Sequence, residues 1–221
     1  MIRILRVVLA SVIFAATPAF ADQAVEVGGS WALLNKPASA RASIILIPGG
    51  DGVLGVRPDG SFSSLKGNQL VRTRKAFLGH GIATLTIDRG VNVAEAVTYM
   101  RKVASPVYVV ATSRGTLRVP ESFSAKPNGI VLTGGFLNDV RSLVGSAAAL
   151  PRTLVVHHRK DGCKYTPPSA VEPFKAWGGS KVTVAWMDGG TDSGNPCQAR
   201  GYHGFAGQDG RVVSTIAGFA R

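Results

Sequence analysis

One serine in the sequence stands where an apolar strand must turn sharply into a helix. Ser113 lies at the centre of the segment ATSRG, between the β-branched run 107–111 and a predicted helix from Thr116 onward. Such a turn brings two backbones close together, so the residues two before and two after the serine must be small. Ala111 and Gly115 meet that need, although Ala111 stands where the usual G-x-S-x-G pattern of such a turn has glycine. We therefore favour a nucleophile over a serine that only caps a helix.

A serine hydroxyl becomes a good nucleophile beside a general base that an acidic side chain in turn orients. The sequence has four histidines that could be the base: His80, His157, His158 and His203. Several carboxylates follow predicted strands: Asp51, Asp88, Asp139, Asp161 and Asp188. Which of these side chains can reach Ser113 depends on the fold.

Strand-like and helix-like segments alternate after about residue 40. Apolar or β-branched runs predict buried strands at 43–47, 83–87, 107–111, 129–133, 153–157 and 181–186. Helices are expected at 69–78 (closed by Gly79), at 93–103, from 116 onward, at 168–177 and at 210–221, and one or two edge strands within 24–36. This alternation predicts an α/β fold with a mostly parallel sheet and helices on both faces. Because no linker or repeat interrupts it, we expect residues 22–221 to form one domain.

Functional groups of such sheets gather at the carboxyl ends of the strands, where Ser113 is expected. In this arrangement the chain resembles the α/β-hydrolase fold superfamily, most of all its small exported members without a large lid. The resemblance covers roughly residues 41–221 through the order of elements and the positions of motifs. It implies a triad in the chain order serine, acid, histidine, an oxyanion hole after an early strand, and hydrolysis of an ester or related acyl bond.

The resemblance implies that His203 is the base. It lies between glycines in the segment GYHG, after the last predicted strand and before the last helix, where the family has its histidine. His80 precedes Ser113 in the chain and does not fit the order of the triad. His157 and His158 end a strand and are expected to have structural roles.

The acid implied by the resemblance is Asp161, just past the strand 153–157. It would hold His203 in the correct tautomer and stabilise the imidazolium. Asp139, past the preceding strand, is the alternative. Asp188 and Asp192 stand near Gly189 and Gly190 and are expected to form turns.

An oxyanion hole needs backbone N–H donors aimed at the developing negative charge. The resemblance implies Arg114, the residue after the nucleophile, and Gly50 in the turn after strand 43–47, with Asp51 as the second choice for the latter. The side chain of Arg114 could also attract an anionic acyl group, which is a hypothesis from its position. The mechanism requires neither a metal nor an organic cofactor.

Cys163 and Cys197 are the two cysteines of the sequence. An even number in an exported chain favours a disulfide, and the pair lacks the spacing of a zinc site. Cys163 follows Asp161 by two residues and Cys197 precedes His203 by six. A bond between them would tie the loop of the acid to the loop of the histidine.

The N-terminal segment 1–21 reads as an export signal. Arg3 and Arg6 precede an apolar run from Val7 to Ala16, and the segment ends in AFA. We expect a mature chain from Asp22 in the periplasm or outside the cell, with no stable insertion in a membrane.

Composition excludes several classes of protein. With 45% hydrophobic and 17% charged residues, the chain is not disordered as a whole. Its net charge of +12 comes from lysines and arginines in runs no longer than two, so we do not expect nucleic-acid binding.

We expect an exported serine hydrolase that acts on an ester of a small or accessible polymeric acyl substrate. Action on a peptide, amide or thioester, or acyl transfer to an acceptor other than water, is the alternative on the same triad. A different class is a non-catalytic module whose basic surface binds an anionic polymer. The sequence does not indicate an oligomeric state.

Overall fold

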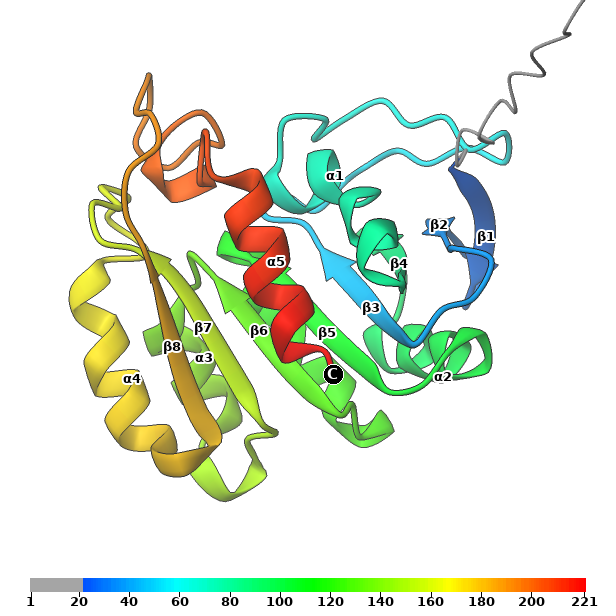
Figure 1. Ribbon diagram of the computed structural model, residues 1–221. Coiled ribbons are helices and arrows are strands. Elements are labelled where there is room, and N and C mark those ends of the chain that lie inside the picture. Colours follow the sequence, from blue (N-terminus) through cyan, green and yellow to red (C-terminus); the bar gives the residue numbers. More distant parts are fainter. Residues whose placement is uncertain (1–21) are drawn as a thin grey trace, which may run out of the picture.

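The computed structural model describes residues 22–221. The predicted export signal, residues 1–21, lies outside the described residues. Eight strands form one sheet in the order β1-β2-β4-β3-β5-β6-β7-β8 (Figure 1). The strands are β1 (Gln23–Val27), β2 (Ser30–Asn35), β3 (Ala42–Ile47), β4 (Ile82–Ile87), β5 (Val107–Thr112), β6 (Gly129–Thr133), β7 (Thr153–His158) and β8 (Val182–Met187).

Most neighbouring strands run parallel. From β4 through β3, β5, β6 and β7 to β8 every pair is parallel, whereas β2 pairs antiparallel with both β1 and β4. The register places Ile47 opposite Ala111 and Thr112 opposite Thr133, so β3, β5 and β6 end at the same edge. The loops that follow these strands therefore meet there, as the sequence predicts for a mostly parallel sheet.

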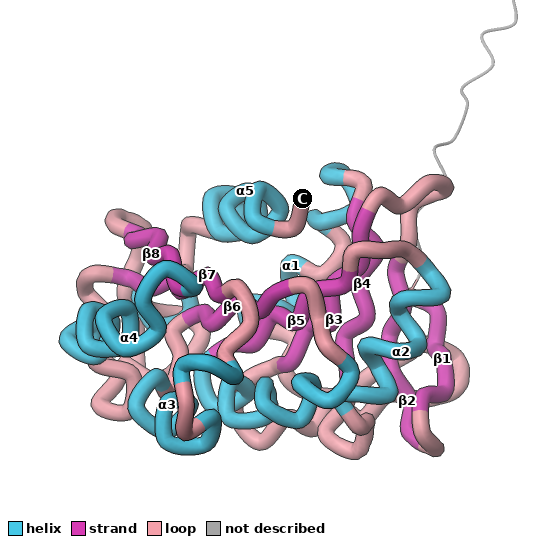
Figure 2. The backbone as a smooth tube through the Cα atoms, turned by 90° about the horizontal axis from the view of Figure 1, so that it is seen from below, coloured by secondary structure: helices cyan, strands magenta, loops and turns pink. Residues whose placement is uncertain are grey.

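Helices cover both faces of the sheet (Figure 2). The α-helices are α1 (Gln69–Thr73), α2 (Val93–Val103), α3 (Leu137–Val144), α4 (Val171–Gly178) and α5 (Asp209–Phe219). One face packs against α2, α3, α4 and a 3₁₀ helix at Ser113–Ala125, and the other against α1, α5 and a 3₁₀ helix at Ala76–His80. The α/β fold class predicted from the sequence is confirmed.

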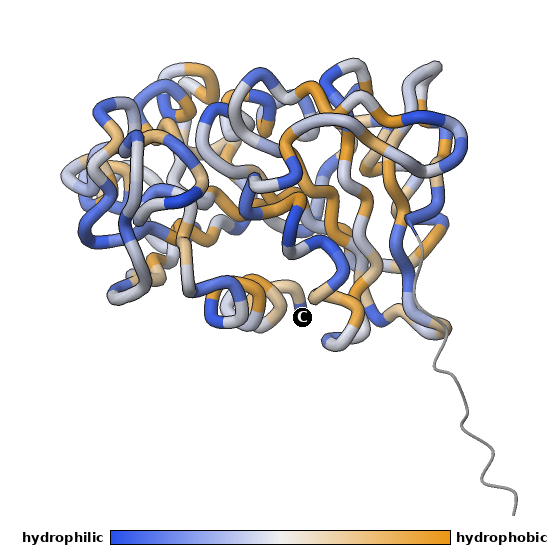
Figure 3. Tube along the Cα trace, turned by 90° about the horizontal axis from the view of Figure 1, so that it is seen from above, coloured by the Kyte–Doolittle hydropathy of each residue, from blue (hydrophilic) through white to orange (hydrophobic). Residues whose placement is uncertain are grey.

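The alternation of side chains along each strand supplies a core to both faces. In β3, Ile45 and Ile47 belong to the cluster under α2, whereas Ile44 and Leu46 belong to the cluster under α5. Burial on both faces explains why this strand is continuously apolar rather than alternating. Figure 3 shows the same pattern, with hydrophobic strands inside and hydrophilic segments outside.

Three elements differ from the sequence prediction. The helix expected at 69–78 is α1 followed by the separate 3₁₀ helix, and it is Gly81, with φ of 69°, that ends this helix rather than Gly79. The segment after Ser113 is a 3₁₀ helix instead of an α-helix, and it contains Pro120, which has no N–H for an α-helical bond. Helix α3 was not expected at all. Within residues 22–221, no helix is long and apolar enough to span a membrane.

Candidate active site

Ser113 occupies the sharp turn between β5 and the 3₁₀ helix. Its φ of 52° lies in the left-handed region, which a residue other than glycine rarely adopts. A Cβ on Gly115 would collide with the carbonyl oxygens of Ile47 and Pro48, and a Cβ on Gly49 would lie 2.9 Å from Ser113 Cβ. The close approach of backbones expected for this turn is therefore present, and two glycines make room for it.

His203 lies in the short 3₁₀ helix Tyr202–Gly204, between β8 and α5. Its Nε2 is 2.9 Å from Ser113 Oγ, and the residue is only 5% exposed. The backbone of Gly134, at the end of β6, packs against the imidazole: a Cβ there would lie 3.5 Å from two ring atoms. This contact and the hydrogen bond hold the ring against the serine.

Asp161 holds the other side of the imidazole. Its Oδ2 is 2.9 Å from His203 Nδ1, and its Oδ1 accepts the N–H of Cys163 at 2.9 Å. With Nδ1–H donating to the carboxylate, His203 Nε2 is free to accept the proton of Ser113. Asp139, the alternative acid, lies on α3 and makes no hydrogen bond to His203.

Thr166 is a contact of this carboxylate that the sequence did not indicate. Its hydroxyl lies 3.0 Å from Asp161 Oδ2 and 3.1 Å from His203 Nδ1. Because Nδ1–H already donates to Asp161, the Thr166 hydroxyl is left to donate to the same carboxylate oxygen. Two donors thus fix the orientation of Asp161 Oδ2.

His157 packs behind the acid as a buried second histidine. Its Nε2 lies 3.0 Å from the carbonyl oxygen of Thr166 and 3.4 Å from Asp161 Oδ2. Burial lowers the pKa of His157, although the nearby Asp161 carboxylate acts in the opposite direction. A neutral ring that donates Nε2–H to Thr166 fits this environment.

A disulfide and an arginine hold the loops that carry Asp161 and His203. Cys163 and Cys197 form the predicted disulfide, which joins the loop after β7 to the loop after β8. Arg72 of α1 donates to the carbonyl oxygen of Gly204 at 2.7 Å and pairs with Asp209 at 2.7 Å. Arg72 therefore holds the residue next to His203 to the start of α5, a role for which the sequence carries no signal.

His80, His158 and Asp188 take no part in the hydrogen bonds that join Ser113, His203 and Asp161. His158 bonds the carbonyl oxygen of Gly189 at 2.9 Å and stacks on Tyr202 at 4.5 Å, whereas His80 is exposed. Asp188 accepts the N–H of Gly189 at 3.0 Å, as expected of a turn former.

Gly50 and Arg114, the predicted oxyanion donors, both line a cavity that also contains Ser113. The loop after Gly50 is held by Asp88, the residue that follows β4. Its carboxylate accepts the backbone N–H groups of Leu54, Gly55 and Val56 at 2.8–3.1 Å. Asp88 thus gives the turn after β3 a fixed support.

Two cavities meet at Ser113. One, of about 410 Å³, is lined by His203, Gly204 and Asn68 among others, and the other, of about 370 Å³, by Leu117, Phe136 and Tyr165. Gly50, Ser113 and Cys197 line both cavities. The serine can therefore be reached from two sides.

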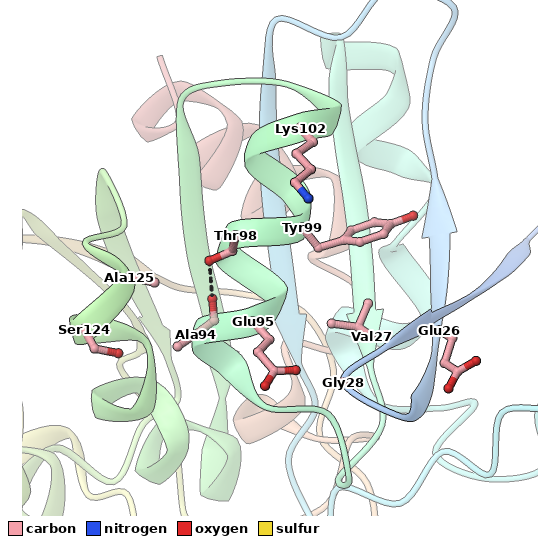
Figure 4. Close-up of a pocket in the computed structure, with 10 residues that line it drawn as sticks. All are labelled: Glu26, Val27, Gly28, Ala94, Glu95, Thr98, Tyr99, Lys102, Ser124 and Ala125. Carbon is pink, nitrogen blue, oxygen red and sulfur yellow. Dashed lines mark hydrogen bonds between the residues drawn. The ribbon is translucent and has the colours of Figure 1, made fainter.

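Another cavity, of about 460 Å³, lies between α2 and the hairpin of β1 and β2 (Figure 4). Glu26, Glu95 and Lys102 line this cavity. Ser113, His203 and Asp161 do not. Across the described part of the chain, no three His, Cys, Asp or Glu side chains are grouped so that they could hold a metal ion.

Solved structures of other proteins share the fold of this chain. No protein-family model and no curated protein matches the sequence. Among solved structures, the chain is similar to an α/β serine hydrolase homologue from Coxiella burnetii (15% identity, TM-score 0.61, 95% of this chain and 100% of that one). It is also similar to an α/β serine hydrolase without lid from Xanthomonas campestris (14% identity, TM-score 0.57, 92% of each chain).

An esterase/lipase from an uncultured bacterium is similar as well, with 13% identity, a TM-score of 0.61, and coverage of 94% of this chain and 86% of that one. At these identities the likeness concerns the fold alone. The evidence for the site is the pair of hydrogen bonds that join Ser113, His203 and Asp161 within this chain. The protein has the α/β-hydrolase fold, with Ser113, His203 and Asp161 arranged as the triad of a serine hydrolase.

Proposed function

We propose that this protein is an exported serine hydrolase that cleaves a carboxylic ester through an acyl-enzyme on Ser113. The observation that carries the proposal is the continuous chain of hydrogen bonds from Ser113 Oγ through His203 to Asp161 Oδ2, each 2.9 Å long. Serine, base and orienting acid in this order form the arrangement that activates a hydroxyl for attack on a carbonyl.

In the first half of the reaction, Ser113 Oγ attacks the ester carbonyl carbon while His203 Nε2 takes the hydroxyl proton. The backbone N–H groups of Gly50 and Arg114 stabilise the oxyanion of the tetrahedral intermediate. The intermediate collapses when the carbon–oxygen bond to the alcohol breaks, and His203 Nε2 gives its proton to the departing oxygen. Asp161 stabilises the imidazolium between these two steps.

In the second half, a water molecule attacks the carbonyl carbon of the acyl-enzyme and gives a proton to His203 Nε2. The second tetrahedral intermediate then releases the acid, and Ser113 Oγ recovers the proton from His203. The net reaction consumes one water and yields one carboxylic acid and one alcohol.

The two cavities beside Ser113 are proposed to bind different parts of the substrate. A general acid must lie within hydrogen-bond reach of the leaving oxygen, so the alcohol belongs in the cavity that His203 lines. The acyl group then belongs in the cavity of Leu117, Phe136 and Tyr165. The rings of Phe136 and Tyr165 stack with centroids 5.7 Å apart, which offers an apolar wall to the acyl group.

An ester is proposed over an amide or thioester because esterases and lipases are named among the similar structures. Tyr165 is 56% exposed, so its cavity opens to solvent, which suits a small or an accessible polymeric substrate. The export signal in residues 1–21, the disulfide and a single mature domain at 22–221 belong to the same proposal, which places the enzyme in the periplasm or outside the cell.

Hydrolysis of matched substrates tests the choice of bond. We would compare para-nitrophenyl butyrate, the para-nitroanilide of butyrate and a butyryl thioester, each with wild-type protein and with Ser113→Ala. The proposal expects turnover of the ester that disappears in the variant and exceeds that of the anilide. Faster cleavage of the anilide or thioester would assign the triad to that bond, and equal turnover by Ser113→Ala would refute an acyl-enzyme on Ser113.

A further inference from the structure

Three arginines from two segments converge on a cavity next to the proposed acyl site. Arg89 follows β4, and Arg114 and Arg118 belong to the 3₁₀ helix that begins at Ser113; all three line a cavity of about 330 Å³. This cavity shares Gly50, Arg114 and Leu117 with the acyl cavity, but shares only Gly50 with the cavity that His203 lines. It is therefore an extension of the acyl side of the site.

The three arginines differ in what they already bind. Arg118 donates to the carbonyl oxygen of Val91 at 2.7 Å and pairs with Glu121 at 2.9 Å, so its guanidinium is held in place. Across residues 22–221, the guanidinium groups of Arg89 and Arg114 have no hydrogen-bond or ion-pair partner. Two cationic groups at this cavity are thus available to a ligand.

The backbone under Arg89 is fixed. Its N–H donates to Asp88 Oδ1 at 2.8 Å, and the same carboxylate holds the loop that follows Gly50. The stem of Arg89 packs over the backbone of Gly52, where a Cβ would lie 3.7 Å from Arg89 Cβ. One carboxylate therefore places both the oxyanion turn and the base of Arg89.

Acidic groups at the cavity do not cancel its charge. Asp51 is the one carboxylate among its lining residues, and its Oδ1 is occupied by the N–H of Val53 at 3.0 Å. Even with Arg118 neutralised by Glu121, Arg89 and Arg114 outnumber Asp51. The cavity remains a place where an anion is favoured.

We propose that Arg89 and Arg114 bind an anionic group, a carboxylate or phosphate, carried by the acyl half of the substrate. This inference rests on the proposed function and narrows its substrate class to acidic acyl esters. Guanidinium groups suit this task because they form charge-assisted, paired hydrogen bonds with carboxylate and phosphate oxygens. The arginines bind the acyl group next to Gly50 and leave the alcohol to the cavity of His203.

The test compares esters that differ in one charge. The para-nitrophenyl monoester of adipic acid carries a free carboxylate on its acyl chain, and its methyl ester removes that charge; an analogue with a phosphonate in place of the carboxylate separates the two anions. The acetate ester of para-hydroxybenzoate places the carboxylate on the leaving group instead. The readout is the ratio of kcat/KM for each charged ester to that of its neutral partner, after subtraction of uncatalysed hydrolysis.

The proposal expects wild-type protein to prefer the acidic acyl ester by about tenfold, and Arg89→Gln to lower that ratio about fivefold. Raising the ionic strength to about 0.5 M should weaken the preference, because Arg89 is exposed. Lys36→Gln removes the same charge from an exposed position after β2, at the opposite edge of the sheet, and should leave the ratio unchanged.

Three results would overturn the inference: a wild-type ratio near one, an unchanged ratio in Arg89→Gln, or an equal loss in Lys36→Gln. A preference only for the charged leaving group would also refute it, because the anion would then lie on the wrong side of Ser113. If no ester is cleaved, the proposed function fails separately. Calorimetric titration of Ser113→Ala, with and without Arg89→Gln, by the intact charged and neutral adipate esters still decides whether the anion is bound.

Discussion

The nucleophile and its two partners are held in place by different means. Ser113 sits in a turn fixed by backbone contacts with Gly49, Ile47 and Pro48 at the ends of buried strands. Asp161 and His203 lie on loops beyond β7 and β8, and side-chain bonds and a disulfide hold them. The position of Ser113 therefore depends on the space between packed backbones, whereas the positions of Asp161 and His203 depend on specific side-chain bonds. Substitutions in the two regions should lower activity for different reasons.

Gly115→Ala should have the largest effect on activity, because it removes the space that the turn of Ser113 needs. The new methyl group would collide with two backbone carbonyls that cannot move without shifting β3. We expect activity to fall at least about 100-fold and the free energy of unfolding by about 3 kcal/mol. Enzyme assays and urea unfolding measure both effects.

Gly218→Ala is the matched control, since the position is in α5 and has open space around it. It should be neutral or slightly stabilising. Equal activity of Gly115→Ala and Gly218→Ala would mean that backbone packing does not hold the serine.

Loss of the disulfide should have the next largest effect on activity, and it acts on the loops of Asp161 and His203. The Cys163–Cys197 bond spans 34 residues of sequence. Replacing both cysteines by serine should lower the free energy of unfolding by up to about 4 kcal/mol. Activity should fall as well, because the loops of Asp161 and His203 lose their common anchor.

Urea unfolding and turnover per labelled active site would be measured for the double variant and for dithiothreitol-treated wild type. Full activity after complete reduction, verified by thiol titration, would show that the other contacts of the two loops suffice.

Thr166→Val should have a smaller effect on activity, through the orientation of Asp161. Valine keeps the shape of the side chain but removes the hydroxyl that donates to Asp161 Oδ2. We expect kcat to fall about tenfold at an unchanged KM, and Thr166→Ser to recover most of it. If Thr166 were only structural, the number of titratable active sites would fall while kcat per active site stayed the same.

The smallest expected effect concerns His157 and pH. Burial places the pKa of His157 below the ordinary value of 6.5, so below that pH the unfolded chain binds a proton that the folded protein resists. Stability should therefore decline as pH falls from about 6.5 toward the lowered pKa, by at most about 1.4 kcal/mol per pH unit for this group.

The groups that contact His157 or act on its pKa are Asp161, Thr166, His158, His203 and Trp186. Because these remain in place, the loss of stability between pH 7.5 and pH 5 should be shallower in His157→Gln than in wild type when both are followed by urea unfolding. Identical slopes would contradict a neutral, buried His157.

Much of the fold could be predicted because its signals are local. The buried strands are continuous apolar runs, and the turn at Ser113 needs small neighbours that Ala111 and Gly115 provide. Their alternation with helices implies the parallel sheet. Helix α3 escaped prediction because only Leu137 and Val140 are buried in it. The conformation after Ser113 depends on tertiary packing and on Pro120, which periodicity does not reveal.

For the site, the sharp turn with small neighbours indicated Ser113, and the resemblance to the α/β-hydrolase fold superfamily implied Asp161 and His203. Thr166 and Arg72 could not be selected, and Asp88 was named only as a carboxylate that follows a strand, because each acts through a backbone or carboxylate group that only the folded chain brings near. A lone threonine or arginine has no signature in the sequence. The supporting contacts of the loops are therefore what the structure adds.

The central claim is that Ser113 is an activated nucleophile. The most direct measurement is stoichiometric labelling of the purified mature protein with a fluorophosphonate, followed by mass spectrometry of the labelled peptide, with Ser113→Ala as the control. The account predicts one label per chain, on Ser113, and none in the variant. No labelling of folded, disulfide-bonded wild type, or equal labelling of Ser113→Ala, would contradict it.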